Sequence, residues 1–354
     1  MDLSPVLAGT IEAVKPLDDI SMQKAAARWD SIAKPLHSLG KLEDLVVLLA
    51  GIVSDPEPSI KKKAVIVMCA DNGVVDEGVT QTGREVTAVV AGNIQKGCSS
   101  VCTMGRYAGA DILPFDIGIV TDTLADRRYK VRYGTANMTN GPAMTRQEAL
   151  QAIEAGISIA AEYRAAGYEL LATGEMGIGN TTTSSAVASV LTGCSVELMT
   201  GRGAGLTSAG LKKKIDAIHR AIARNRPDPG DPVDVLAKVG GLDLAALTGL
   251  YLGCAAHRIP LVMDGFISCT AALAASVLCP LCLEYIIPSH RSAEPGAVKL
   301  LQILGKDPLL YGNMCLGEGT GAVTLFPILD MALAVYDCAS TFKEIAVEQY
   351  NELK

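Results

Sequence analysis

Two glutamates stand in sequence contexts where a carboxylate could act as an acid or a base. Glu318 lies between Gly317 and Gly319, so no bulky neighbour along the chain shields its side chain. Apolar surroundings would raise the pKa of such a carboxylate, which suits a general base working near neutral pH. Glu175 follows an apolar run and sits within a glycine loop. The local sequence alone favours an exposed turn for Glu318, so both interpretations stay open at this point.

Two glycine loops are typical of segments that hold a phosphate. In the loop at 174–183, three glycines precede Asn180 and Thr181, whose side chains suit the start of a helix. Backbone N–H groups, hydroxyls and the helix dipole would then point at one spot and favour an anion. The spacing matches neither the dinucleotide fingerprint nor the P-loop, and a plain tight turn explains it equally well. The second loop, at 200–206, precedes the cationic run 212–214, a pattern that more commonly marks an ordinary flexible loop.

A third cluster, at 289–296, contains Ser289, His290 and Ser292 together with an arginine. Hydroxyl, imidazole and guanidinium groups at a strand end can hold ribose hydroxyls or a phosphate. A Ser–His nucleophile is disfavoured, because neither serine sits in the strained G-x-S-x-G turn that such enzymes use.

The elements that must position these residues follow from the apolar runs. Five short, β-branched runs alternate with helical patterns, at 64–69, 111–115, 168–172, 259–263 and 285–287. They predict an α/β fold with a Rossmann-like parallel sheet covered by helices on both faces. Ligands of such sheets bind beyond the carboxyl ends of the strands. We therefore expect the polar residues that follow the strands to converge on one site, although each alone could be a helix cap: Asp71, Asp116, Glu175, Asp264 and His290.

Both ends of the chain have helical patterns. Residues 18–33 and 41–52 are amphipathic or apolar candidates near the start, and 321–339 and 342–353 are candidates near the end. A Pro-rich turn at 54–59 separates the first part from the strands. We predict a small helical domain from 1–58 with 325–354, and a large α/β catalytic domain from 59–324.

Composition excludes several classes of function. The chain has 354 residues, and its net charge of −7 gives no basic stripe for nucleic acid. Ten irregularly spaced cysteines without a secretory signal favour free thiols in the cytoplasm. The pair at 279 and 282 has no second pair or histidine pair beside it, so we expect no metal site. The uncharged segment 266–283 contains polar residues and a proline, which favours burial in a core or subunit interface over a membrane span.

Taken in order along the chain, these segments resemble the nicotinate-nucleotide–dimethylbenzimidazole phosphoribosyltransferase family. The resemblance runs from about residue 20 to about residue 340, nearly the whole chain. The stretches that carry it are 69–74 with 77–79 and 85–87, 115–119, 137–144, 174–182, 238–244, 263–266, 289–290 with 292–294, and 316–319.

The resemblance implies a reaction and a set of residues. Ribose 5-phosphate would pass from nicotinate mononucleotide to an aromatic base, for assembly of a cobamide lower ligand, with no cofactor and no metal. Glu318 would be the general base and Glu175 a second carboxylate near the ribose. The family also implies a helical domain from both chain ends, and a dimer in which the second subunit completes the site. The positions that match the family's donor-phosphate and ribose contacts are Gly177, Asn180, Thr181, Gly203, Lys214 and Ser292, and Asp264, Ser289 and His290 are further substrate-binding candidates.

Three departures from the family's usual pattern concern the acceptor. Asn72 stands where a histidine is usual, and Val90 where some members have glutamine. The loop at 81–84, which includes Thr82, lacks the Ser-Pro or Tyr-Pro pair of dimethylbenzimidazole-selective members. Benzimidazole, purine and phenolic acceptors therefore stay open, as do a homodimer and a heterodimer with a similar chain. A non-catalytic nucleotide-binding subunit is the rival from another class, but the presence of both glutamates favours an active chain.

Overall fold

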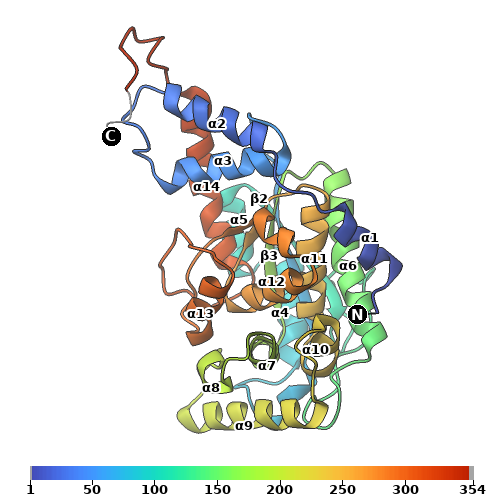
Figure 1. Cartoon of the computed structure of the whole chain (residues 1–354). Coiled ribbons are helices and arrows are strands. Elements are labelled where there is room, and N and C mark those ends of the chain that lie inside the picture. Colours follow the sequence, from blue (N-terminus) through green and yellow to red (C-terminus); the bar gives the residue numbers. More distant parts are fainter. Residues whose placement is uncertain (1, 351–354) are drawn as a thin grey trace.

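A five-stranded parallel sheet forms the centre of the computed structural model, which describes residues 2–350 (Figure 1). Its strand order is β2-β1-β3-β4-β5, and each neighbouring pair is parallel. Each of the five predicted apolar runs contributes a strand, so the α/β prediction is confirmed. The bounds are β1 (Lys63–Ala70), β2 (Ala110–Gly118), β3 (Leu170–Met176), β4 (Leu261–Met263) and β5 (Ile286–Pro288).

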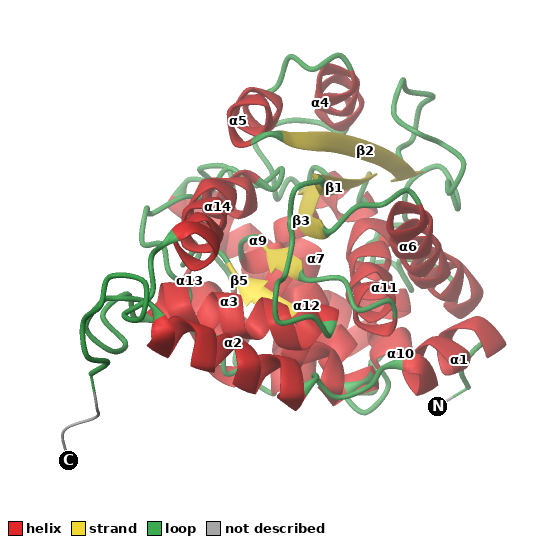
Figure 2. Ribbon diagram, turned by 90° about the horizontal axis from the view of Figure 1, so that it is seen from above, coloured by secondary structure: helices red, strands yellow, loops and turns green. Residues whose placement is uncertain are grey.

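Strand β1 shows why the sheet is covered on both faces. All eight of its residues are buried. Ala64, Ile66 and Met68 belong to one hydrophobic core, whereas Val65 and Val67 belong to the other. Successive side chains of a strand point to opposite faces, so one strand contributes to two cores. Helices α6 (Arg146–Ala165) and α11 (Leu242–Ala256) lie on one side and α14 (Thr320–Cys338) on the other (Figure 2).

The remaining helices surround this sheet. Helix α12 packs against α7, α11 and α13, so most of the segment 266–283 is buried, as predicted. One helix of the described chain, α14, is long and apolar enough to cross a membrane, and 50% of its apolar window is buried by packing. The helix bounds are α4 (Glu85–Gln95), α5 (Ser100–Ala108), α7 (Asn180–Thr192), α8 (Val196–Met199), α9 (Ser208–Asn225), α10 (Pro232–Val239), α12 (Phe266–Leu278) and α13 (Pro295–Ile303), with 3-10 turns at Gly73–Glu77 and Pro280–Tyr285.

The two ends of the chain meet in a group of helices that extends from one end of the molecule (Figure 1). Helices α2 (Asp19–Ser31) and α3 (Lys41–Val53) pack together, and α14 packs against α3. The rings of Trp29 and Tyr336 lie 5.1 Å apart, edge to face. Helix α1 (Pro5–Ala13) instead packs against α6 and α11. The division into two domains at 58 and 325 stays a prediction.

The prediction of a helix over 342–353 is wrong for the part of that range that the structure describes, 342–350. Thr341 forms an isolated bridge with Ile32, and the chain then makes turns over 342–346 and no regular element over 347–350, while 351–353 lie outside the described range. Thr341 and Glu344 cap a single turn, and Ala346 then adopts a φ of 54°. Ile345 and Val347 are about half exposed, at 50% and 47%. A short helix needs several apolar residues packed on a core, and Phe342, at 4% exposure, is the one buried residue of 342–350.

Candidate active site

A pocket of about 240 Å³ opens beyond the carboxyl ends of β3, β4 and β5. This is the edge of the sheet at which open parallel folds hold their ligands. The pocket brings together residues from segments that are far apart in sequence. The sequence-derived candidates that line it are Thr82, Val90, Glu175, Gly177, Asn180, Thr181, Gly203, Asp264, His290, Ser292 and Glu318.

Two of the five polar strand ends do not belong to this pocket. Asp71 Oδ2 accepts a hydrogen bond of 2.8 Å from Val120 N, and Asp116 Oδ1 accepts one of 2.8 Å from Ile119 N. Lys130 Nζ donates to Asp116 Oδ2 at 3.1 Å. These aspartates hold the segment that follows β2 against the ends of β1 and β2. The prediction that all five side chains converge is therefore wrong for Asp71 and Asp116, and holds for the other three.

Glu175 lies near the end of β3 and is nearly buried, at 7% exposure. Burial raises its pKa to about 8, and the hydrogen bond that Asn180 Nδ2 donates to Oε2 opposes that rise. The carboxylates of Asp243, Asp264 and Glu318 raise the pKa further. A cation placed beside such a carboxyl group would lower its pKa, because the cation stabilises the ionised form.

Glu318 is held by an unusual backbone rather than exposed in a turn. Its φ is 60°, and the glycines on either side both have a φ of 86°. A left-handed conformation is costly for a non-glycine residue, and such strain gathers at functional sites. The turn packs on β3, since a Cβ atom at Gly174 would lie 2.7 Å from Glu318 O, and a Cβ atom at Gly317 would collide with Glu175 Oε1. The two glutamates are therefore neighbours across the strand end.

The Glu318 carboxylate is partly buried and has few polar contacts. Its Oε2 atom is buried and has no hydrogen-bond partner among the described residues. Burial raises its pKa, the Val101 backbone N–H lowers it, and the charge of Asp264 raises it again. A partly buried carboxylate with a raised pKa that lines a pocket can take a proton from a bound ligand.

Asp264 and His290 form the wall next to Glu318. Asp264 Oδ1 accepts a hydrogen bond of 2.9 Å from Ala322 N, near the start of α14, and lies 4.0 Å from His290 Nδ1. Burial raises the pKa of Asp264, and the nearby His290 lowers it. Ser289 is fully buried behind this wall, where its hydroxyl donates to Met263 O at 2.6 Å and lies 3.0 Å from His290 Nδ1.

The two glycine loops meet at the other end of the pocket. Lys214 Nζ donates to Thr181 Oγ1 at 2.8 Å and to Gly201 O at 3.2 Å, so it joins the first turn of α7 to the loop 200–206. Gly203 has a φ of 54°, and a Cβ atom there would lie 2.9 Å from Thr181 Oγ1. Burial lowers the pKa of Lys214 to about 8. A buried cation beside a helix N-terminus is an arrangement suited to a phosphate.

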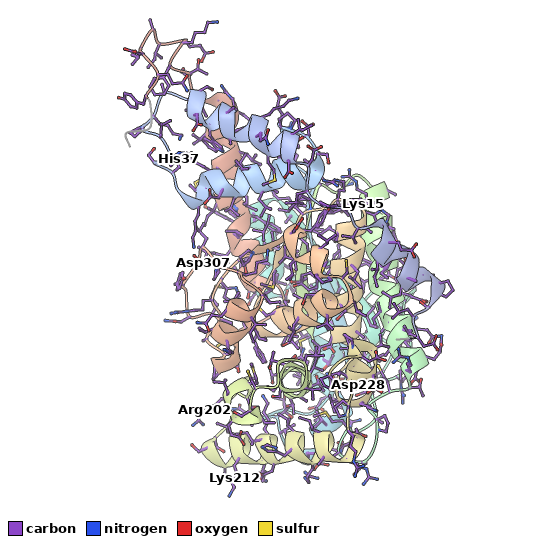
Figure 3. The ribbon with its side chains drawn as sticks, viewed as in Figure 1. Lys15, His37, Arg202, Lys212, Asp228 and Asp307 are labelled. Atoms are coloured by element: carbon purple, nitrogen blue, oxygen red, sulfur yellow. The ribbon has the colours of Figure 1, made fainter. Side chains whose placement is uncertain are left out.

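Only one lysine of the cationic run 212–214 takes part in this arrangement. Lys214 is 1% exposed, whereas Lys212 is exposed on the outer side of α9 (Figure 3). Arg202, which Figure 3 also labels, lines the pocket and donates to Leu206 O at 2.7 Å. Arg202 is the one charged residue of the loop 200–206, and this was the available signal for it in the sequence.

The apolar part of the pocket was not predicted from the sequence. Met176, Ile178, Phe266, Met314 and Leu316 line it together with Val90. Two of these residues, Met176 and Leu316, lie close to the glutamates in sequence, which was the available signal. Apolar walls with a few polar groups are typical of sites that bind small molecules.

Comparisons with known proteins agree with this geometry. Residues 14–347 match a family model described as phosphoribosyltransferase. The chain is 51% identical over 348 residues to the nicotinate-nucleotide–dimethylbenzimidazole phosphoribosyltransferase of Ruminiclostridium cellulolyticum, covering 97% of this chain and 98% of the relative. The protein of the same name from Acetivibrio thermocellus is 50% identical, covering 98% and 99%. The crystal structure of CobT from Thermus thermophilus is similar, with a TM-score of 0.88, 38% identity, and coverage of 94% and 100%.

The fold, the site and these matches define a phosphoribosyltransferase. More particularly, the chain belongs to the nicotinate-nucleotide–dimethylbenzimidazole phosphoribosyltransferase family.

Proposed function

We propose that this chain transfers ribose 5-phosphate from nicotinate mononucleotide to a nitrogen of an aromatic base, with dimethylbenzimidazole as the first candidate. The products are nicotinate and an α-riboside 5′-phosphate for the lower ligand of a cobamide. The observation that carries the proposal is the pocket itself. Two adjacent glutamates line one part of it and two glycine loops line another, where Lys214 lies buried behind Thr181 and donates to its hydroxyl.

The residues divide the work between donor and acceptor. The donor phosphate would lie at the loops of Gly177 and Gly203, close to Thr181 and Lys214, with Ser292 beside it. Its pyridinium ring carries a positive charge and leaves as a neutral pyridine, so departure requires no added acid. The negative charge of Glu175 would stabilise the positive charge that develops at C1′ of the ribose.

Bond making and breaking follow from this placement. The acceptor nitrogen attacks C1′ from the face opposite the leaving group, which turns a β-riboside into an α-riboside. The C1′–N bond of the donor breaks, and its electron pair goes to the pyridine nitrogen. The Glu318 carboxylate, which lines the pocket, takes the N–H proton of the acceptor.

The acceptor ring would lie against the apolar side of the pocket, near Thr82 and Val90. We also propose that two chains associate, either as identical copies or as this chain with a similar one. Exposed apolar residues on and beside α12 and α13 support an interface there: Val277 at 37%, Leu281 at 37%, Val298 at 41% and Ile303 at 43% exposure.

Release of nicotinate tests the proposed function. The purified protein is given nicotinate mononucleotide with and without dimethylbenzimidazole, and nicotinate and the riboside product are quantified by chromatography. We expect release that requires the acceptor, and an α-configured product by NMR. Release at the same rate without acceptor would identify a nucleotide glycohydrolase instead. No release with either mixture would contradict the proposal.

A further inference from the structure

A layer of buried polar side chains lies beneath the floor of the pocket. Asp243, the second residue of α11, and Asn72, which follows β1, are both 0% exposed. A Cβ atom at Gly177 would lie 2.7 Å from Asp243 Oδ2 and 3.2 Å from Asn72 Nδ2. Since Gly177 lines the pocket, both side chains reach the underside of its floor.

The Asp243 carboxylate is firmly held at one oxygen only. Its Oδ1 atom accepts a hydrogen bond of 3.0 Å from Leu244 N, whereas Oδ2 has no partner of normal geometry among the described residues. Burial raises the pKa of Asp243 to about 6, and the nearby amides of Asn180 and Asn72 oppose that rise. A buried carboxylate with so few partners costs free energy of folding. Stability therefore does not explain its presence.

Asn180 connects this layer to the pocket. Its Nδ2 atom donates a hydrogen bond to Glu175 Oε2, and the same amide lowers the pKa of the Asp243 carboxylate. An ionised carboxylate only accepts hydrogen bonds, and an amide can donate only through its NH₂ group. With a pKa of about 6, Asp243 is ionised above that pH and only accepts, which favours the orientation that turns the NH₂ end of Asn180 toward Asp243 and toward Glu175 Oε2. Asp243 thus fixes which end of the amide meets Glu175.

We propose that Asp243 is a positioning residue for the transfer reaction, acting through Asn180 to orient the Glu175 carboxylate toward the donor ribose. The proposal rests on the proposed function, and Asp243 itself is expected to contact neither substrate. Displacement of a group in the site by about 1 Å can cost on the order of 100-fold in rate. The loss should therefore appear in kcat rather than in donor binding.

Asp243→Asn is the informative variant, because it keeps the size of the side chain and removes its charge. We expect kcat to fall on the order of 100-fold, with the KM for nicotinate mononucleotide changed by less than roughly threefold. The matched control is Asp231→Asn, at an aspartate that caps α10 by accepting from Val233 N and Asp234 N. It should retain wild-type kcat.

The pH profile separates positioning from a general structural defect. The carboxylates that face Glu175 are Asp243 on α11, Asp264 after β4 and Glu318 before α14, and each raises the pKa of Glu175. His290 faces Asp264, and Cys69 on β1 lies near the same group of carboxylates. Loss of the Asp243 charge should therefore move the acid limb of kcat/KM to lower pH. A variant that is merely less folded would keep the wild-type limb.

A double-mutant cycle with Asn180→Ala tests the route of the effect. If Asp243 acts through the Asn180 amide, Asp243→Asn should not lower kcat any further in a protein that already carries Asn180→Ala. Additive losses of kcat in the double variant would overturn the positioning role, and so would a wild-type kcat and pH profile in Asp243→Asn alone. Either result would leave the proposed function intact. Absence of turnover by the wild-type protein would overturn both. Should Asp243→Asn lack a cooperative melting transition, Asp243→Ser goes through the same cycle.

Discussion

The buried carboxylate of Glu175 predicts a pH-dependent stability that can be calculated and measured. Its pKa of about 8 in the folded protein lies above the ordinary value of 4.5. The folded protein therefore keeps a proton that the unfolded chain releases, and stability falls as pH rises from about 4.5 through about 8. Integrated from pH 5 to pH 9, this single group costs about 4 kcal/mol.

Glu175→Gln removes this titration and keeps the shape of the side chain. The stability of the variant relative to wild type should therefore increase by about 4 kcal/mol between pH 5 and pH 9. Urea unfolding of both proteins without ligand across this pH range measures the difference. Glu12→Gln, at an exposed position on α1, is the control and should give a constant difference. If the difference in unfolding free energy between Glu175→Gln and wild type is also the same at every pH, the raised pKa of Glu175 is refuted. The same variant should transfer ribose phosphate far more slowly, because the charge that faces the ribose is missing.

Three further substitutions test other parts of the site. Glu318→Gln should still bind nicotinate mononucleotide but lower kcat by about 100- to 10,000-fold, measured by nicotinate release, and near-normal turnover would remove Glu318 as the base. Lys214→Met should raise the KM for the donor by about 10- to 100-fold. Since the pKa of Lys214 is about 8, the KM of the wild-type protein should also rise as pH increases through 8. A wild-type KM that does not change with pH would contradict the role of Lys214 in donor binding. Gly177→Ala should lower the free energy of unfolding by about 1–3 kcal/mol, because the new Cβ would meet Ala70 O and Asp243 Oδ2. Gly92→Ala is the control and should not lower it, because the space around Gly92 is open. Equal melting temperatures for the two variants would contradict the close packing at Gly177.

Much of the site was predictable because its residues follow buried strands or glycine loops. Glu175, Asp264 and His290 each come after an apolar run, and the topology of a parallel sheet places such residues at one edge. Glu318 was recognisable by its two glycine neighbours. Its local sequence nevertheless favoured an exposed turn, because the packing of that turn on Gly174 is a contact between residues distant in sequence.

The failed predictions share a physical cause. Asp71 and Asp116 follow strands in the same way as the pocket residues, but the segment after β2 folds back and uses both carboxylates as acceptors. The Asp243–Asn72 layer was missed for a similar reason, since its members come from distant segments and meet only beneath Gly177. The terminal segment 342–350 has an amphipathic sequence, but only Phe342 of these residues is buried. In each case tertiary contacts decided an outcome that local sequence left open.

A competition between acceptors tests the central claim most directly. The purified chain is given nicotinate mononucleotide with dimethylbenzimidazole, adenine, phenol and p-cresol together, and the riboside phosphates are identified by mass spectrometry. We expect dimethylbenzimidazole riboside phosphate as the main product. Phenolic riboside phosphates as the main products would show that the pocket around Thr82 and Val90 selects a different acceptor. Absence of every riboside phosphate would contradict the transferase itself.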